Sequence, residues 1–182
     1  MMSLLFSSCN NWRRAVSSKI VHQPEKPIDN MMLVFTEYQG EISGWNEDTY
    51  DKAVKDKFNN LEYERFRNHL NDVGWDIFLP LVSHDFRKVF ENHNEYTFND
   101  FQEKTKAVEV DYVLLINMKI NEPRGEVIRR IFQVYLIDIQ TGTHIWSGYG
   151  YHNPGNIIRK GTAKRLLKGI KRDLVEERMI VS

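Results

Sequence analysis

Cysteine is nearly absent from this chain, and its scarcity excludes two kinds of site. The 182 residues contain a single cysteine, Cys9. One thiol can form neither an intrachain disulfide nor a cysteine-based zinc cluster. Long hydrophobic runs are missing too, because no stretch approaches the roughly 20 apolar residues that a membrane-spanning helix needs.

An excess of charge of either sign is also missing. The chain carries 25 basic and 25 acidic residues, so its formal net charge is zero. A neutral total argues against a protein that grips nucleic acid with its whole surface, and it leaves room for a local basic patch. The length and the 41% of hydrophobic residues predict one domain with a real core.

The C-terminal third is rich in β-forming residues separated by turn signals. Three strands are predicted, over residues 111–120, 127–138 and 144–151, with a tight turn at Gln140-Thr141-Gly142 before the last. This pattern predicts a three-stranded antiparallel meander. Apolar residues at helical spacing over 156–177 then predict an amphipathic helix docked on the sheet.

The preceding part of the chain mixes both element types. A compact apolar run over 31–38 predicts a first strand, and helical spacing follows over 46–73 and ends at Gly74. Residues 75–82, with Pro80, predict an edge strand. Short helices are predicted over 83–93 and 99–108. The order favours an α/β (α+β) fold, a mixed sheet of about five strands with helices packed on it.

The surroundings of Cys9 are similar to a bacterial lipoprotein signal. A short apolar run and small residues precede the cysteine, and a polar stretch follows it. A secretory signal normally has a positive start and an apolar stretch of roughly 7–15 residues, which the chain does not offer before Cys9. Either the true start lies upstream of Met1 or the match is accidental. We expect residues 1–30 to be a truncated signal, lipid-anchor region and flexible tether, and residues 31–182 to be one α/β domain.

The C-terminal motifs resemble the small α/β domain of bacterial envelope lipoproteins. The family comprises LpoB-type activators of penicillin-binding proteins, the N-terminal domain of TolB and curli-secretion lipoproteins. The resemblance lies in the strand that begins at Val110, the segment Asp138-x-x-Thr-Gly-x-x-x-Trp146, and the helix from Ala163 to Leu174. It implies the fold and a location in the cell envelope. The charged stretch over 47–71 and the insert over 83–94 depart from the family pattern, so no binding site is carried over.

No pattern of catalytic or metal-binding residues stands out. The histidines, which match no ligand spacing and are expected at the surface, are His22, His69, His84, His93, His144 and His152. Ser147 lies in a predicted strand without the G-x-S-x-G pattern of a nucleophile elbow. Gly148 and Gly150 also lie in that strand, where glycine marks a bulge or a close approach and not a phosphate loop. We therefore expect no catalytic residue, no metal and no cofactor.

Two surfaces are candidates for binding. Trp45 lies in a loop with glycines and is predicted to be an exposed anchor for a partner, together with Tyr38 and Tyr50. The basic face of the last helix is predicted to meet phosphates or anionic lipid headgroups, unless it is simply the solvated side of a docked helix. Its residues are Lys164, Arg165, Lys168 and Lys171.

Three functions follow from these patterns. The preferred hypothesis is a non-enzymatic envelope lipoprotein domain that binds a protein partner through an exposed sheet edge or the Trp45 loop. Such a domain would meet the membrane only through a lipid anchor on Cys9. The alternative is a cytoplasmic nucleic-acid or anionic-ligand module that uses the basic helix, with nucleic acid the less favoured ligand. A hydrolase is the third, supported only by the abundance of carboxylates.

Overall fold

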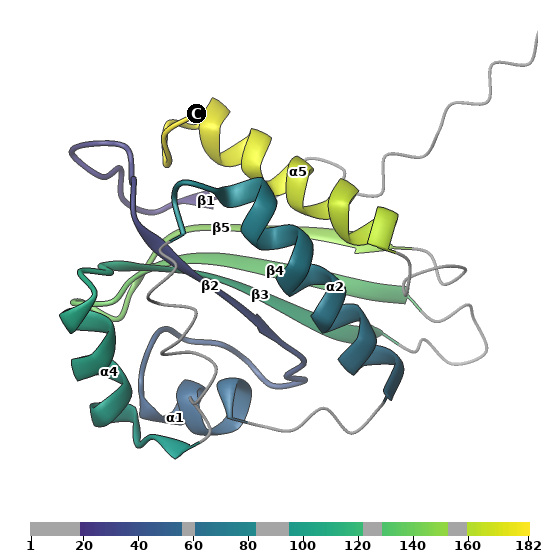
Figure 1. Ribbon diagram of the computed structural model, residues 1–182, viewed down its shortest axis with the longest axis horizontal. Coiled ribbons are helices and arrows are strands. Elements are labelled where there is room, and N and C mark those ends of the chain that lie inside the picture. Colours follow the sequence, from purple (N-terminus) through teal and green to yellow (C-terminus); the bar gives the residue numbers. More distant parts are fainter. Residues whose placement is uncertain (1–18, 56–60, 83–94, 122–128, 153–159) are drawn as a thin grey trace, which may run out of the picture.

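A five-stranded mixed sheet forms the centre of the molecule (Figure 1). The computed structural model describes residues 19–55, 61–82, 95–121, 129–152 and 160–182. The strands lie in the order β1-β5-β4-β3-β2. Their bounds are Lys19–Ile20 for β1, Met31–Thr36 for β2, Tyr112–Asn121 for β3, Arg129–Asp138 for β4 and His144–His152 for β5. The predicted fold class is confirmed.

Helices cover both faces of this sheet. The helical segments are α1 (Glu47–Thr49), the π-helical η1 (Tyr50–Val54), α2 (Leu61–Phe78), α4 (Phe98–Ala107) and α5 (Lys160–Glu176). Helices α2 and α5 run side by side over one face (Figure 1). Segments η1 and α4 pack on the opposite face, where their side chains join those of β2 and β3. No helix in the described ranges is both long and apolar enough to cross a membrane.

The predicted meander is confirmed. Strand β3 pairs antiparallel with β4, from Tyr112 opposite Asp138 onward, and β4 pairs antiparallel with β5. The turn before β5 is closed by Asp138, whose side chain accepts from the Thr141 N–H at 2.8 Å and whose carbonyl accepts from the Gly142 N–H at 2.9 Å. Gly142 has φ of +69°, a conformation that favours glycine.

Strand β2 makes the sheet mixed and divides the core into two layers. It runs parallel to β3, and all six of its residues are buried. Leu33 packs toward α2 and α5, whereas Met32 and Val34 pack toward η1 and α4. Side chains alternate between the faces of a strand, so an apolar run is what a strand covered on both faces requires.

The predicted edge strand over 75–82 is wrong. Helix α2 continues to Phe78, and Gly74, predicted as its C-cap, is buried inside it. A Cβ atom at Gly74 would lie 2.5 Å from Leu33 Cδ2, so the glycine lets α2 approach β2 closely. The helix continues because Val73 and Phe78 extend its apolar stripe into the core, and such packing overrides local propensity.

The predicted tether does not reach residue 30. Lys19 and Ile20 form β1, which pairs antiparallel with β5. Ile28 is buried, its N–H donates to the Met179 carbonyl at 2.9 Å, and its own carbonyl accepts from the Val181 N–H at 3.1 Å. These long-range contacts fix a segment whose sequence has no periodicity. Cys9 and the rest of the predicted tether, and the helix predicted over 83–93, lie outside the described residues.

Candidate binding surfaces

The Trp45 side chain is buried, so the expectation of an exposed anchor is wrong. It is 3% exposed. The rings of Tyr50, Phe98 and Phe101 surround it, with centroids 6.5, 6.3 and 6.0 Å from that of Trp45. The indole therefore packs in the core layer under η1 and α4 and is not accessible to a partner in this conformation.

A contact with the β4–β5 turn explains why the Trp45 loop folds inward. The Trp45 N–H donates to the Gly142 carbonyl at 2.9 Å. The two backbones lie so close that a Cβ atom at Gly142 would be 2.8 Å from the Trp45 carbonyl oxygen. Asn46 then caps α1 by accepting from the Thr49 N–H at 2.9 Å. No local pattern indicates this contact, because the two loops are far apart in the chain.

The other two predicted aromatic anchors are also held by the fold. Tyr50 is fully buried, and this burial raises the pKa of its hydroxyl. Tyr38 is half-buried, and its backbone N–H and carbonyl both bond to the side chain of Asn117, at 2.8 and 2.9 Å. Partner binding by these three aromatic residues stays a prediction.

The described residues cover only part of the outer side of β5. Strand β1 pairs with Trp146 and Ser147 alone. From Gly148 to His152, no other strand of the described chain pairs with this side of β5, and we call this stretch the β5 edge. Within this stretch, Tyr149 is 37% exposed. Ile20, opposite Trp146 on the covered part of β5, and Val21, opposite Ile145, are 45% and 57% exposed.

Main-chain groups of the β5 edge point outward at alternate residues. The Val21 N–H donates to the Ile145 carbonyl at 2.9 Å, so the main-chain groups of Ile145 point outward, away from β4. Orientation alternates along an antiparallel strand, so Ser147, Tyr149 and Tyr151 direct their N–H and C=O groups the same way. Ser147 meets β1, whereas Tyr149 and Tyr151 lie beyond it.

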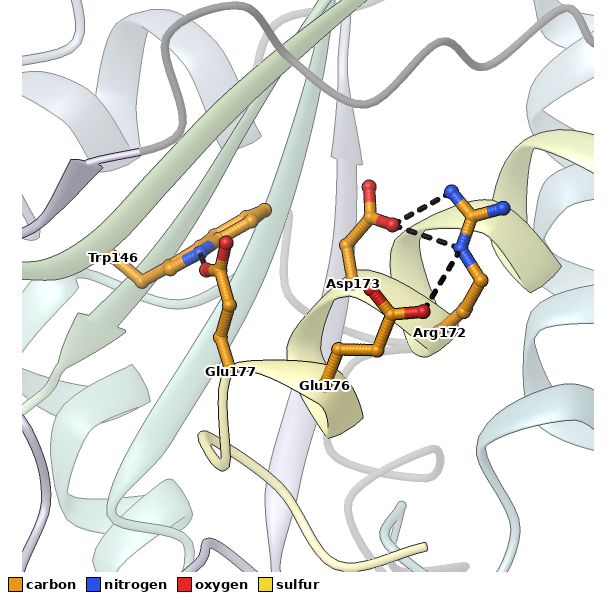
Figure 2. A network of polar contacts seen from close by, with 5 residues as sticks. All are labelled: Trp146, Arg172, Asp173, Glu176 and Glu177. Atoms are coloured by element: carbon orange, nitrogen blue, oxygen red, sulfur yellow. Dashed lines mark hydrogen bonds and ion pairs between the residues drawn. The ribbon is translucent and has the colours of Figure 1, made fainter.

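A rigid anchor holds β5 beneath this edge. Trp146 is fully buried, and its Nε1–H donates to the Glu177 carboxylate after α5 (Figure 2). A Cβ atom at Gly148 would lie 2.7 Å from Trp146 Cη2, so the glycine leaves room for the indole ring of Trp146. Nearby, Arg172 Nη2 donates to the buried Asp173 carboxylate at 2.7 Å, which adds a second polar contact on α5.

The basic residues of α5 line a groove against α2. Its volume is about 670 Å³, and three of the four predicted residues, Lys164, Lys168 and Lys171, lie along it. Arg165 is exposed and does not line it. The Lys171 ammonium donates to the Ile77 carbonyl of α2 at 3.0 Å. Helical spacing predicted the lysines, but only the packing of α2 reveals the groove.

His144 is the described histidine that departs most from a surface site. It is half-buried, and its ring stacks on Tyr135 with centroids 4.5 Å apart. Burial lowers the pKa of the imidazole, and its Nε2 has no hydrogen-bond partner in the described part of the chain. Within those same ranges, no three His, Cys, Asp or Glu side chains gather as metal ligands. His84 and His93 lie outside the described residues.

Comparison with solved structures finds proteins of distantly similar structure. No family model matches the sequence, and no curated protein matches it. Two crystal forms of the PelC dodecamer from Paraburkholderia phytofirmans are similar at 10% identity. One has a TM-score of 0.41 over 85% of this chain and 97% of PelC, and the other 0.43 over 91% and 99%.

A third similar structure is the LpoB C-terminal domain from Salmonella enterica. Its identity is 16% and its TM-score 0.31, over 72% of this chain and 88% of that domain. At these identities and TM-scores, none of the three structures carries an argument about what this chain does.

Proposed function

We propose that this chain is a non-enzymatic, protein-binding domain of the bacterial cell envelope that receives an extended segment of its partner at the β5 edge. The observation that carries the proposal is the stretch from Gly148 to His152, whose outer side lacks a paired strand among the described residues. In strand addition, main-chain hydrogen bonds supply affinity and alternate side chains supply specificity.

The residue types of the β5 edge support this role. Soluble proteins usually protect an edge strand with lysine, proline, inward charges or a covering loop. The sequence Gly-Tyr-Gly-Tyr-His over 148–152 contains neither lysine nor proline nor an acidic residue. Tyr149 adds an exposed aromatic ring, and tyrosine is enriched at protein interfaces. Among the described residues, this edge therefore offers open main-chain groups and an aromatic side chain to an incoming strand.

The rigidity of the strand also favours binding. Association costs free energy for every group that becomes ordered in the complex. Strand β5 is already ordered, because it pairs with β4 along its length and Trp146 is fixed in the core. A partner would therefore order mainly itself, and the docking surface would change little.

The experiment uses a pair of substitutions at one position. Proline at 149 removes an outward N–H without touching the β4 ladder, whereas threonine keeps it. A photo-crosslinking residue at Ile20, opposite Trp146 and next to the β5 edge, reports on this side of β5, and one at the exposed Lys106 of α4 is the control position. We expect an intermolecular adduct from position 20 but not 106, retained with Tyr149→Thr and lost with Tyr149→Pro.

Two results would count against this proposal. One is an adduct that forms equally from positions 20 and 106. The other is an adduct from position 20 that Tyr149→Pro leaves unchanged, since binding would then not involve the outward backbone. Thermal melts of both variants establish that loss of the adduct does not come from unfolding.

Anchoring at Cys9 is a separate part of the proposal. It is supported by the small residues before the cysteine and the polar stretch after it. Intact-mass analysis of the membrane fraction, with the native upstream codons included, should find a diacylglyceryl group on Cys9 that Cys9→Ser removes. An unmodified soluble chain that begins at Met1 would overturn the anchor and the envelope location with it.

A further inference from the structure

Positive charge is concentrated on one segment of an otherwise neutral chain. Helix α5 has no acidic residue before Asp173, and its basic residues up to that point are Lys160, Lys164, Arg165, Lys168, Lys171 and Arg172. The partial positive charge at the beginning of a helix acts within the first turn, so Lys160 is unfavourably placed there. This arrangement opposes the stability of the isolated helix.

Two of these lysines have no ion-pair partner among the described residues. Lys164 and Lys168 are one helical turn apart and exposed, and neither forms an ion pair with another described residue. Like charges at this spacing repel each other. By contrast, Arg172 contacts Asp173 at 2.7 Å and Glu176 at 3.9 Å. Repulsion therefore remains at one end of the groove and is relieved at the other.

The groove gives this charge a defined shape. Its far wall is the last turn of α2, with Asp76 and Ile77. The Lys171 side chain donates to the Ile77 carbonyl and so ties α5 to α2 along the groove. The groove is open at the surface and has a volume of about 670 Å³.

We propose that the Lys164–Lys168 end of this groove binds a phosphate-type oxyanion. Each ammonium offers three donors, and an oxyanion between them would relieve their mutual repulsion. The same chemistry is presented by a phospholipid headgroup and by a soluble phosphate ester. This site lies on α5 and α2, apart from the β5 edge, and it does not depend on the proposed protein binding.

The test uses the full chain with Cys9→Ser, so that lipidation plays no part. The probes are glycerol phosphate in solution and phosphatidylcholine vesicles with or without phosphatidylglycerol. We expect salt-dependent binding that Lys164→Glu with Lys168→Glu weakens about tenfold or more. The control makes the same charge change on α4, with Lys104→Glu and Lys106→Glu, and should leave affinity nearly unchanged.

The outcomes separate the sources of the oxyanion. Binding to glycerol phosphate identifies a soluble ester as sufficient, and binding only to phosphatidylglycerol vesicles identifies a lipid surface. Equal weakening by both double variants, or no salt-dependent binding to either probe, would overturn the site. The milder pair Lys164→Gln and Lys168→Gln repeats the test if the charge reversals unfold the protein. Failure here leaves the crosslink from position 20 unaffected.

Discussion

The two edges of the sheet differ in what covers them. At one edge, all six residues of β2 are buried between α2 on one face and η1 on the other, and the Met31 N–H donates to the Leu81 carbonyl at 2.8 Å. At the other edge, β1 pairs with two residues of β5, and no other described strand pairs with that side. Burial at β2 supplies stability, whereas we propose that the β5 edge supplies a surface for recognition. Substitutions at the two edges should therefore separate folding from binding.

The largest effect on the free energy of unfolding is expected at the β2 edge. Leu33 of β2 packs in the core layer between the sheet and helices α2 and α5. Truncation with Leu33→Ala leaves a cavity and should lower the free energy of unfolding by about 2–5 kcal/mol. Urea denaturation measures this change. A loss well below that range would show that β2 is less tightly enclosed than its burial indicates.

A glycine pair sharpens the account of how α2 closes the β2 edge. Alanine at 74 would place a Cβ atom 2.5 Å from Leu33 Cδ2, so Gly74→Ala should cost about 1–3 kcal/mol through overpacking. At Gly161 of α5, a Cβ atom would meet no neighbouring atom within 4 Å, so Gly161→Ala should stabilise by up to about 1 kcal/mol. Stabilisation by both substitutions, measured in the same urea titrations, would contradict the close approach of α2.

At the β5 edge, a substitution should be able to change binding without changing stability. Tyr149 is partly exposed and makes no core contact, so Tyr149→Thr should change the free energy of unfolding by no more than about 0.5 kcal/mol. The same substitution tests how much the ring itself contributes to the crosslink from position 20. A large loss of stability would mean that the β5 edge belongs to the folding core.

The smallest effect concerns pH at the start of β5. Burial lowers the pKa of His144 below its ordinary 6.5, so the unfolded chain binds a proton more readily than the folded one. Stability is then full above about pH 6.5 and decreases as the pH falls toward the folded pKa. The melting temperature should fall less between about pH 8 and about pH 5 in His144→Gln than in the parent. A profile of His144→Gln identical to that of the parent would remove His144 as the cause.

The sequence predicted those elements whose residues follow a local pattern, which are the meander and α5. Alternation and turn residues located the meander, and helical spacing located α5, with Lys164, Lys168 and Lys171 on one side of it. Residues 75–78 contain β-formers, yet they extend α2 because they pack on the sheet. A two-residue strand such as β1 has no periodicity to detect.

The candidate surfaces were harder to predict than the fold. Trp45 is buried by a contact with Gly142, which lies far away in the sequence. The β5 edge is visible only once the strand order is known, because the same residues in a central strand would be covered. Which side of a strand remains open is a property of the whole sheet and not of the segment.

Amide hydrogen exchange along β5 tests the central claim most directly, because neighbouring residues of one strand serve as controls for each other. We predict that the amides of Tyr149 and Tyr151, which point outward, exchange at least about a hundredfold faster than those of Gly148 and Gly150, which point toward β4. Equal protection of all four amides would show that the β5 edge is already paired, by the chain's own first 18 residues or by a second copy, and would contradict a free docking edge.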